Sequence, residues 1–354
     1  MKLSNAKEIA SALNLSVSTV YRVLNNTGRI SEKTRKQVLE YASAVGYQPN
    51  LIAQGLAKRK KYHIAHVIYS SPSNWWKQIK VGAEKAAQEL SEFGVKVSFV
   101  EYAPVPPYEE SINLLDMIEK EELDGIILVP SSHPEIIKAI EAAQERKIPI
   151  VCINVDAPLT SQRLFHYGPN EETVGLLAGE LIGKMINGKG NISIVGSESA
   201  DFRFALRERG FFQQIYKYFP NISILHQNAF PPDNFKKYLC DLLHASGNDI
   251  SAIYVEDSML LSETASILKS LDLSDIVVVG HECLGNCREF LEEGWISATI
   301  CQETFSQGYY PLKLLYHHLL TGASVKPNYY SNVNVVCRSS LGFLQQNEDG
   351  CGFQ

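Results

Sequence analysis

The chain of 354 residues is 45% hydrophobic and 20% charged, which is ordinary for a globular protein with room for two or three domains. No apolar run approaches the roughly 18 residues of a membrane span, and the first 15 residues lack the continuous apolar segment of a signal peptide, so we expect a cytoplasmic protein with no membrane partner. The seven cysteines are an odd number scattered from Cys152 to Cys351, which favours buried thiols over a disulfide framework.

The charge is distributed unevenly along the chain. Residues 1–62 contain eleven Lys and Arg against three Asp and Glu, a net charge of +8. The remainder then holds 22 basic and 36 acidic residues, a net charge of −14, which agrees with −6 for the whole chain. A small basic head on an acidic body indicates that only the head meets a polyanion.

The first predicted element is a helix over residues 6–13, because Ile9 and Leu13 lie one helical turn apart on the same face. Asn14 tolerates the left-handed conformation of a tight turn. Ser16 is a good N-cap for a second helix. The pattern therefore predicts two helices joined by a short turn.

Residues 15–26 read LSVSTVYRVLNN, which is rich in β-branched residues, yet the spacing of its apolar positions is helical. Val20, Val23 and Leu24 share one stripe. The opposite side holds Val17, Ser18, Tyr21, Arg22 and Asn25. A third helix is predicted from Glu32 to about Val45, capped by Ser31 and stopped by Gly46.

Three short helices with a tight turn between the first two describe a helix-turn-helix, in which the exposed start of the second helix contacts bases. A small helical bundle that only holds partners is the alternative. Arg22, the short hydroxyl side chains around it and the net charge of +8 favour DNA binding.

The stretches LSVSTVYRVLNN (15–26) and RISEKTRKQVLEYASAVGYQPNLIAQGLA (29–57) resemble the DNA-binding head of the lactose-repressor/galactose-repressor family. The resemblance implies that Val17, Ser18 and Arg22 read the edges of bases in the major groove. It implies contacts to the DNA backbone at Ser16, Thr19, Tyr21, Asn25, Ser31 and Thr34. Two residues depart from the family pattern, since Asn14 replaces a turn glycine and Tyr21 replaces a small serine.

The segment 49–61 resembles the hinge helix of that family, which orders on operator DNA and pairs with a second copy. By this resemblance Leu56 wedges into the minor groove, where an apolar side chain opens a base step, and Asn50 and Ala53 are further DNA contacts. A plain linker is the alternative, and Gly55 favours it slightly because glycine costs a helix about 1 kcal/mol relative to alanine.

From His63 onward, short apolar runs alternate with longer amphipathic stretches, which predicts parallel sheets covered by helices. The runs are 64–69, 95–102, 125–130, 150–153, 192–195, 222–225, 252–255 and 276–280. These are too many strands for one sheet of modest size. Two α/β lobes are therefore expected, with a ligand at the carboxyl ends of their strands.

Residues 63–345 resemble the type I periplasmic sugar-binding fold, the effector domain of the same repressor family. The stretches that carry the resemblance are WWKQIKVGAE (75–84), LDGIILVP (123–130), RERGF (207–211), VEDSM (255–259), VVGHE (278–282) and ATICQ (298–302). The resemblance implies an effector site lined by Trp75, Trp76, Ser132, Asp156, Arg207, Asp257, Glu282 and Gln302. Core packing of the tryptophans and surface ion pairing of Arg207 and Asp257 are the alternatives.

Some positions of the body depart from the family pattern. Many relatives have Gly-Phe-Asp where this chain has Gly-His-Glu at 280–282, and Ser131 and Ser132 stand where a carboxylate is common. Asn154, Asp156 and Asn170 can supply polar groups instead. The expected effector is therefore a sugar, a sugar acid or a polyol.

Two other motifs do not predict chemistry. Residues 183–190 read GKMINGKG, which lacks the hydroxyl that ends a phosphate-binding loop and leads from a helix into a strand. His281, Cys283 and Cys287 provide too few ligands for a zinc site. No nucleophile and base stand at usable spacing, so we expect no metal, no cofactor and no enzymatic activity.

The predicted fold is an all-α helix-turn-helix head joined by a hinge helix to an α/β effector domain of two parallel-sheet lobes. The head spans 1–48, the hinge 49–61, the effector and dimerisation domain 62–345 and a C-terminal tail 346–354. The predicted function is a transcriptional regulator, in our interpretation a repressor, that binds palindromic operator DNA as a homodimer, with a tetramer as the alternative. A regulator that answers to a protein partner and a solute-binding protein remain alternatives.

Overall fold

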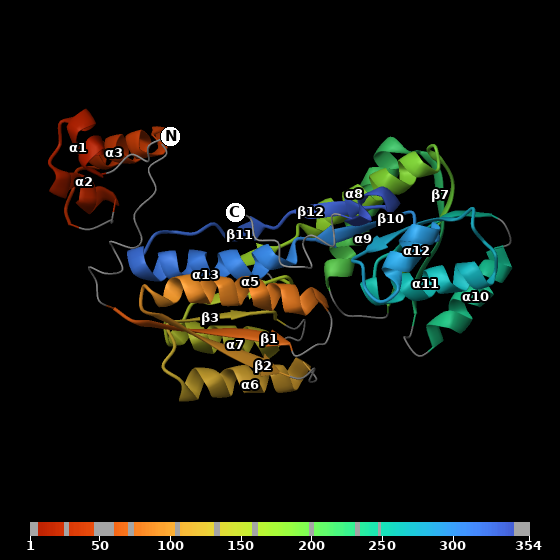
Figure 1. Cartoon of the computed structure of the whole chain (residues 1–354), viewed down its shortest axis with the longest axis horizontal. Helices are drawn as coiled ribbons and strands as arrows, with labels where there is room; N and C mark the ends of the chain where they lie inside the picture. Colours follow the sequence, from red (N-terminus) through yellow and green to blue (C-terminus); the bar gives the residue numbers. More distant parts are fainter. Residues whose placement is uncertain are drawn as a thin grey trace.

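The computed structural model describes a three-helix head and a body of two six-stranded sheets (Figure 1). The described residues are 6–24, 28–45, 60–69, 74–102, 107–130, 135–157, 162–197, 202–230, 234–246 and 249–342. Among them, no helix is long and apolar enough to cross a membrane.

The head contains α1 (Ala6–Leu13), α2 (Val17–Leu24) and α3 (Glu32–Ala44). Its core is made by one face of each helix and includes the fully buried side chains of Ile9, Val20 and Val38. Asn14 has a φ of 52° between α1 and α2, so the predicted left-handed turn is confirmed. The helical interpretation of LSVSTVYRVLNN is confirmed for the part that the structure describes, residues 15–24.

Lobe 1 contains a parallel sheet with the order β11-β5-β4-β3-β1-β2. Its strands are β1 (Tyr62–Tyr69), β2 (Val95–Tyr102), β3 (Gly125–Leu128), β4 (Ile150–Ile153), β5 (Phe165–Gly168) and β11 (Asn328–Tyr330). Its helices are α5 (Asn74–Ser91), α6 (Pro107–Lys120), α7 (Glu135–Glu145) and α13 (Thr304–Thr321). Ile127 packs on the side of α5 and α13 and its neighbour Ile126 on the side of α6 and α7, because successive side chains of a strand point to opposite faces.

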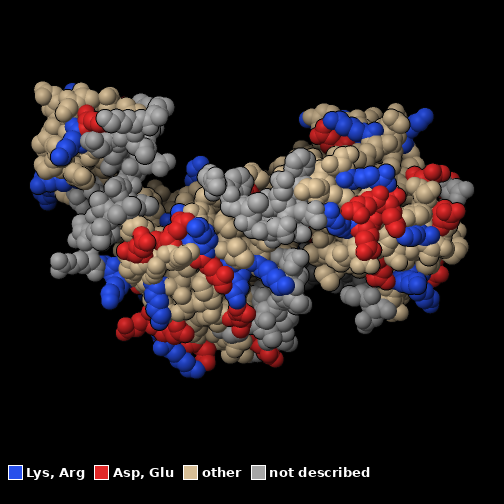
Figure 2. Space-filling view, in the orientation of Figure 1, with Lys and Arg blue, Asp and Glu red and all other residues tan. Residues whose placement is uncertain are grey.

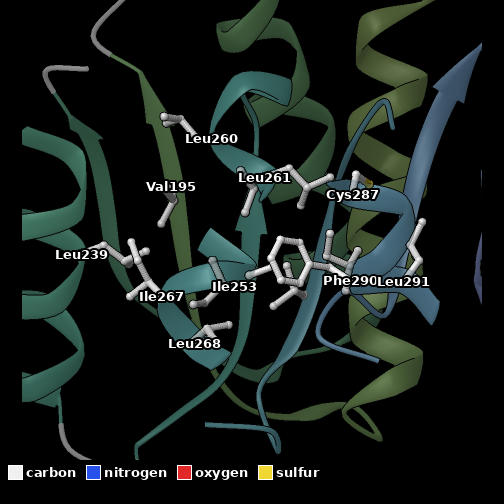
Figure 3. Close-up of a cluster of buried hydrophobic side chains, with 14 of the residues drawn as sticks. Val195, Leu239, Ile253, Leu260, Leu261, Ile267, Leu268, Cys287, Phe290 and Leu291 are labelled. Atoms are coloured by element: carbon white, nitrogen blue, oxygen red, sulfur yellow. The ribbon is translucent and has the colours of Figure 1, made fainter. Parts of the chain in front are cut away.

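Lobe 2 contains a sheet with the order β12-β10-β9-β8-β6-β7, in which β12 alone is antiparallel to its neighbour. The strands are β6 (Lys189–Ser197), β7 (Asn221–Phe230), β8 (Ile250–Val255), β9 (Val277–His281), β10 (Ala298–Gln302) and β12 (Val333–Val336). The helices are α8 (Glu171–Met185), α9 (Phe202–Tyr218), α10 (Phe235–Ser246), α11 (Ser258–Ser270), α12 (Cys287–Glu293) and a short 3₁₀ helix, Arg338–Ser340. Figure 3 shows the core on one face, where Ile253 packs against Leu261 and Phe290.

On the other face of that sheet, α8 and α9 approach each other at two glycines. A Cβ atom on Gly175 would lie 1.9 Å from the backbone oxygen of Arg207, and one on Gly210 would lie 2.0 Å from that of Glu172. Only a residue without a side chain permits this approach. The contact brings the beginning of α8 next to the middle of α9, where Arg207 lies.

The chain passes between the lobes three times, at 168–171, 302–304 and 330–333. The passages are hydrogen-bonded to one another: Ser331 N donates to Gly168 O at 2.9 Å, and Glu303 N donates to Asn332 O at 3.0 Å. Each lobe is therefore assembled from separate parts of the chain, and residues at the passages connect the two sheets.

The predicted class of two parallel-sheet lobes is confirmed, apart from the antiparallel edge strand β12. The eight predicted apolar runs each coincide with a strand. The strands β5, β10, β11 and β12 were not among them. The division of the chain into a head, a hinge, a body and a tail stays a prediction, since 46–59 and 343–354 lie outside the described residues.

Candidate DNA interface and ligand site

The start of α2 presents a capped and exposed face. Ser16 Oγ accepts a hydrogen bond from Thr19 N at 3.0 Å, and the same hydroxyl lies 2.9 Å from Ser18 Oγ and 2.8 Å from Thr19 Oγ1. Val17 is 36% exposed and Tyr21 is 48% exposed. An apolar side chain and a phenol are thus held at the surface beside a row of hydroxyl groups.

The start of α3 repeats the same type of cap. Ser31 Oγ accepts from Thr34 N at 3.2 Å, and the two hydroxyls lie 2.8 Å apart. Arg22 is exposed on α2, and its Cδ lies 3.4 Å from the place of a Cβ on Gly28. In Figure 2 the blue of Lys and Arg outweighs the red of Asp and Glu on the head, whereas both colours mix on the lobes.

The remaining predicted DNA contacts, Asn25, Asn50, Ala53 and Leu56, lie outside the described residues. So does Ser132 of the predicted effector site. The other members of both sets are placed by the structure, and their roles in binding stay predictions.

In lobe 1, Trp75 and Trp76 stand in the first turn of α5, directly after the carboxyl end of β1. Their rings meet edge to face, with centroids 4.5 Å apart and an interplanar angle of 85°. Both pack partly against the lobe 1 core. The buried indole nitrogen of Trp75 has no hydrogen-bond partner in the described part of the chain.

In lobe 2, Arg207 is 5% exposed and is held by two acceptors. Its Nε donates to Glu171 Oε2 at 2.5 Å, and its Nη1 donates to the backbone oxygen of Glu256 at 2.9 Å. Burial lowers the pKa of Arg207, but the Glu171 carboxylate together with Tyr254 and Glu282 raises it overall, so the guanidinium stays charged. Glu171 Oε1 and Glu256 Oε1 are buried without any hydrogen-bond partner among the described residues.

A second group of polar residues joins the two lobes. Asn154, at the end of β4 in lobe 1, donates from Nδ2 to Gln302 Oε1 at 3.0 Å, and its Oδ1 accepts from Arg203 Nη1 at 3.3 Å. Gln302 N in turn donates to Glu282 Oε1 at 3.2 Å. The predicted residues Glu282 and Gln302 are therefore brought together, directly beside a passage of the chain between the lobes.

Two predicted effector contacts have local structural partners. Both carboxylate oxygens of Asp156 accept from Arg163, which also donates to Pro327 O at 2.8 Å and to Asn328 Oδ1 at 2.7 Å. Asp156 thus helps to fix the segment that leads into β11. Asp257 caps α11, because its Oδ1 accepts from Met259 N at 2.9 Å. Arg207 and Glu282 are by contrast buried within the polar centre of lobe 2.

Burial strongly affects the acids of this centre. It raises the pKa of Glu256 to about 8, with a further increase from Glu208 and a decrease from Arg207. It also raises the pKa of Glu282 to about 7. His281 Nε2 lies 2.8 Å from the Tyr254 hydroxyl, and its pKa is far below the usual value because of burial and the nearby arginines.

Sequence reasoning missed Glu171, Glu256 and Arg203 as site residues and named Asn154 only as a possible polar supplement. A positional signal existed for the two glutamates. Glu256 directly follows β8, and Glu171 stands three positions after the end of β5, so both lie at carboxyl ends of parallel strands, where open α/β sheets bind ligands.

The fold and the polar centre define a two-lobed α/β binding protein that carries a helix-turn-helix head. Residues 64–323 match the family model described as periplasmic binding protein domain, and residues 5–50 match the model of the bacterial regulatory proteins of the lacI family. The chain therefore belongs to the family of the periplasmic binding protein domain, and its head carries a domain of the lacI type of bacterial regulatory proteins.

Curated relatives and solved structures agree with this assignment. The chain is 31% identical over 154 residues to the HTH-type transcriptional regulator DegA of Bacillus subtilis (43% of this chain, 44% of the relative) and 27% identical over 174 residues to the catabolite control protein A of Streptococcus mutans (48% and 50%). It thus spans half or less of the length of these relatives.

Solved sugar-binding proteins share the fold of the body. GanP, a glucose-galactose binding protein from Geobacillus stearothermophilus, superposes with a TM-score of 0.70 at 24% identity, covering 80% of this chain and 99% of its own. The sugar-binding protein of a sugar ABC transporter from Bacillus halodurans reaches a TM-score of 0.72 at 20% identity, with the same coverage. At this level of identity the likeness concerns the fold.

Proposed function

We propose that this protein is a DNA-binding transcriptional regulator, a repressor, whose affinity for its operator is controlled by a small carbohydrate-like ligand bound between the two lobes. The observation that carries the proposal is the combination of a lacI-family head with a periplasmic binding protein domain in one chain. The same head favours regulation over solute transport. Its place of action is then the cytoplasm, where the DNA lies.

The exposed face of α2 supports DNA recognition. Val17, Ser18 and Arg22 stand on its solvent side, while Val20 and Val23 hold the helix to the head. A guanidinium can bind the two acceptors of guanine in the major groove, and hydroxyl groups can bind phosphates. One such head reads a half-site, so we propose a homodimer on a palindromic operator.

The test of the DNA function begins with selection of bound sequences from a random duplex library by the full chain. Affinity for the selected duplex and for an unrelated duplex is then measured by fluorescence anisotropy. Arg22→Ala is expected to weaken binding to the selected duplex by about 1–3 kcal/mol and to affect the unrelated duplex much less, because a base contact carries the specificity.

The matched control is Arg288→Ala, which removes the same charge from a partly exposed position on α12 of the body. It should leave both affinities unchanged. An equal loss on both duplexes with Arg22→Ala would contradict base reading by that residue. Absence of any selected sequence would contradict the regulatory function itself.

Control of DNA binding by a ligand requires that the arrangement of the lobes be coupled to the head. A ligand that prefers one arrangement of the lobes shifts the population towards it, and by linkage DNA then changes the affinity for the ligand by the same factor. The polar groups from β4, β10 and α9 that meet at Asn154 are placed to respond to such a change.

A further inference from the structure

The polar centre of lobe 2 contains more carboxylates than cations. Glu171, Glu256 and Glu282 are 6%, 4% and 7% exposed, and Glu208 and Asp257 lie close enough to Glu256 to raise its pKa. Arg203 and Arg207 bring positive charge to the same place. Five carboxyl groups against two guanidinium groups leave an excess of acid at the predicted ligand site.

Arg207 neutralises only part of this excess of acid, because it donates to one carboxylate and to one backbone oxygen. Its Nε donates to Glu171 Oε2 at 2.5 Å, and its Nη1 donates to the backbone oxygen of Glu256 at 2.9 Å rather than to the carboxylate. One carboxyl oxygen on each glutamate, Oε1, stays buried without a partner in the described part of the chain. Both orphan atoms are acceptors in their charged form.

In their charged form both atoms require a hydrogen-bond donor, and the charge of that donor matters. A buried carboxylate without a partner is costly, and charge-assisted hydrogen bonds are about twice as strong as neutral ones. An ammonium group offers three donors and a positive charge. A hydroxyl offers one donor and no charge, and the carboxylate of a sugar acid offers no donor and is repelled.

We propose that the effector is an amino sugar, whose primary ammonium group binds the carboxylate of Glu256 with Glu171 as the neighbouring acceptor. This inference rests on the proposed function and names the chemical class of the ligand of that same site. It narrows the expected sugar, sugar acid or polyol to a cationic hexosamine. The elevated pKa of Glu256 agrees with it, since a bound cation would stabilise the charged form that burial disfavours.

The test is isothermal titration calorimetry of the full chain with D-glucosamine, D-galactosamine and D-mannosamine. Each is compared with its parent hexose, its N-acetyl derivative and the corresponding hexuronate. We expect one hexosamine to bind about tenfold or more tightly than its neutral and acidic counterparts, because only the ammonium group brings a positive charge to the carboxylate of Glu256. Glu256→Gln should bring its affinity down to that of the parent hexose.

The matched control is Glu263→Gln, which makes the same chemical change at an exposed position on α11 of the same lobe and should leave the affinity unchanged. Equal or tighter binding of a hexose or a hexuronate would overturn the inference while leaving the proposed function intact. Unchanged hexosamine affinity in Glu256→Gln would also overturn it. The ligand series on the unaltered chain decides the question if that variant fails to fold.

Binding of none of these sugars would overturn the inference and also count against a carbohydrate effector. DNA binding by the same preparation, measured on the selected duplex, separates this outcome from failure of the regulatory function. A chain that binds its duplex but no sugar would remain a regulator with another kind of signal.

Discussion

The carboxyl group of Glu256 makes the stability of the protein depend on pH, and the direction of this dependence follows from its pKa. The folded state raises the pKa of this group from 4.5 to about 8, chiefly by burial, with Glu208 and Asp257 adding to the rise and Arg207 opposing it. Between these values the folded chain keeps a proton that the unfolded chain releases. The free energy of unfolding therefore falls as the pH rises from about 4.5 to about 8.

Glu256→Gln removes this titration. We expect the variant to have a higher melting temperature than the parent protein at pH 8, and the two to converge towards pH 5, because glutamine stays neutral throughout. Differential scanning calorimetry at several pH values measures the effect, with Glu263→Gln as the exposed counterpart. Parallel pH profiles of parent and variant would show that Glu256 is not buried in its neutral form.

Ser16 makes a second prediction possible at this scale. Its hydroxyl caps α2, so Ser16→Ala should destabilise that helix by about 1 kcal/mol. Faster hydrogen exchange of the α2 amides, measured by mass spectrometry on the full chain, is the expected result. Ser11→Ala replaces an exposed serine inside α1 and serves for comparison. Equal hydrogen exchange of the α2 amides in both variants would contradict a stabilising role of the Ser16 cap.

Individual residues differ in how far the sequence predicts them. Asn14 and Ser16 were predictable because turns and caps depend on neighbouring residues only. The ion pair of Arg207 with Glu171 joins positions 36 apart, and it depends on the glycine contact between α8 and α9. Local patterns carry no information about such a contact, so Arg207 was expected at the ligand and Glu171 was not expected at all.

At the scale of elements, the approach of α8 to α9 positions the acidic centre. Gly210→Ala would place a methyl group 2.0 Å from the backbone oxygen of Glu172, so the helices must separate. We expect a loss of stability of about 1–3 kcal/mol, as for other overpacked sites, together with weaker ligand binding. Chemical denaturation measures the first effect.

Gly342→Ala is the comparison for this prediction, because a Cβ at Gly342 meets no atom within 4 Å. It should leave the denaturation midpoint nearly unchanged. A similar small effect of both substitutions would mean that the two helices adjust to the added methyl group and that their close contact does not position Arg207.

The predictable elements were those with a strong apolar pattern, such as β3 and β8. The strands β5 and β11 read FHYG and NYY, and their polar or short composition gives no clear period. The strand β12 is antiparallel because the chain enters lobe 2 a second time from lobe 1. That reversal follows from the passages between the lobes, which only the three-dimensional arrangement reveals.

At the scale of the whole molecule, the lobes depend on distant parts of the chain. The core of lobe 1 includes Leu312, Leu315 and Tyr316 of α13, although its first strand begins at Tyr62. A chain that ends at Gln302 should therefore leave lobe 1 without its covering helix. We expect rapid hydrogen exchange in β1 and β3 of that fragment, with a chain ending at residue 342 as the intact comparison. Native protection of β1 would contradict the prediction.

The interleaving of the lobes also has a consequence during synthesis. Strand β1 leaves the ribosome first, but the helix that covers its sheet, α13, ends at Thr321. At roughly 5–20 residues per second, the apolar face of this sheet waits on the order of ten to fifty seconds for its cover. Lobe 2 has its five parallel strands by residue 302 and can fold first. Lobe 1, although translated first, thus receives α13 only after the parallel strands of lobe 2 have been made, and the part of its face that α13 covers is until then a natural substrate for chaperones in the cell.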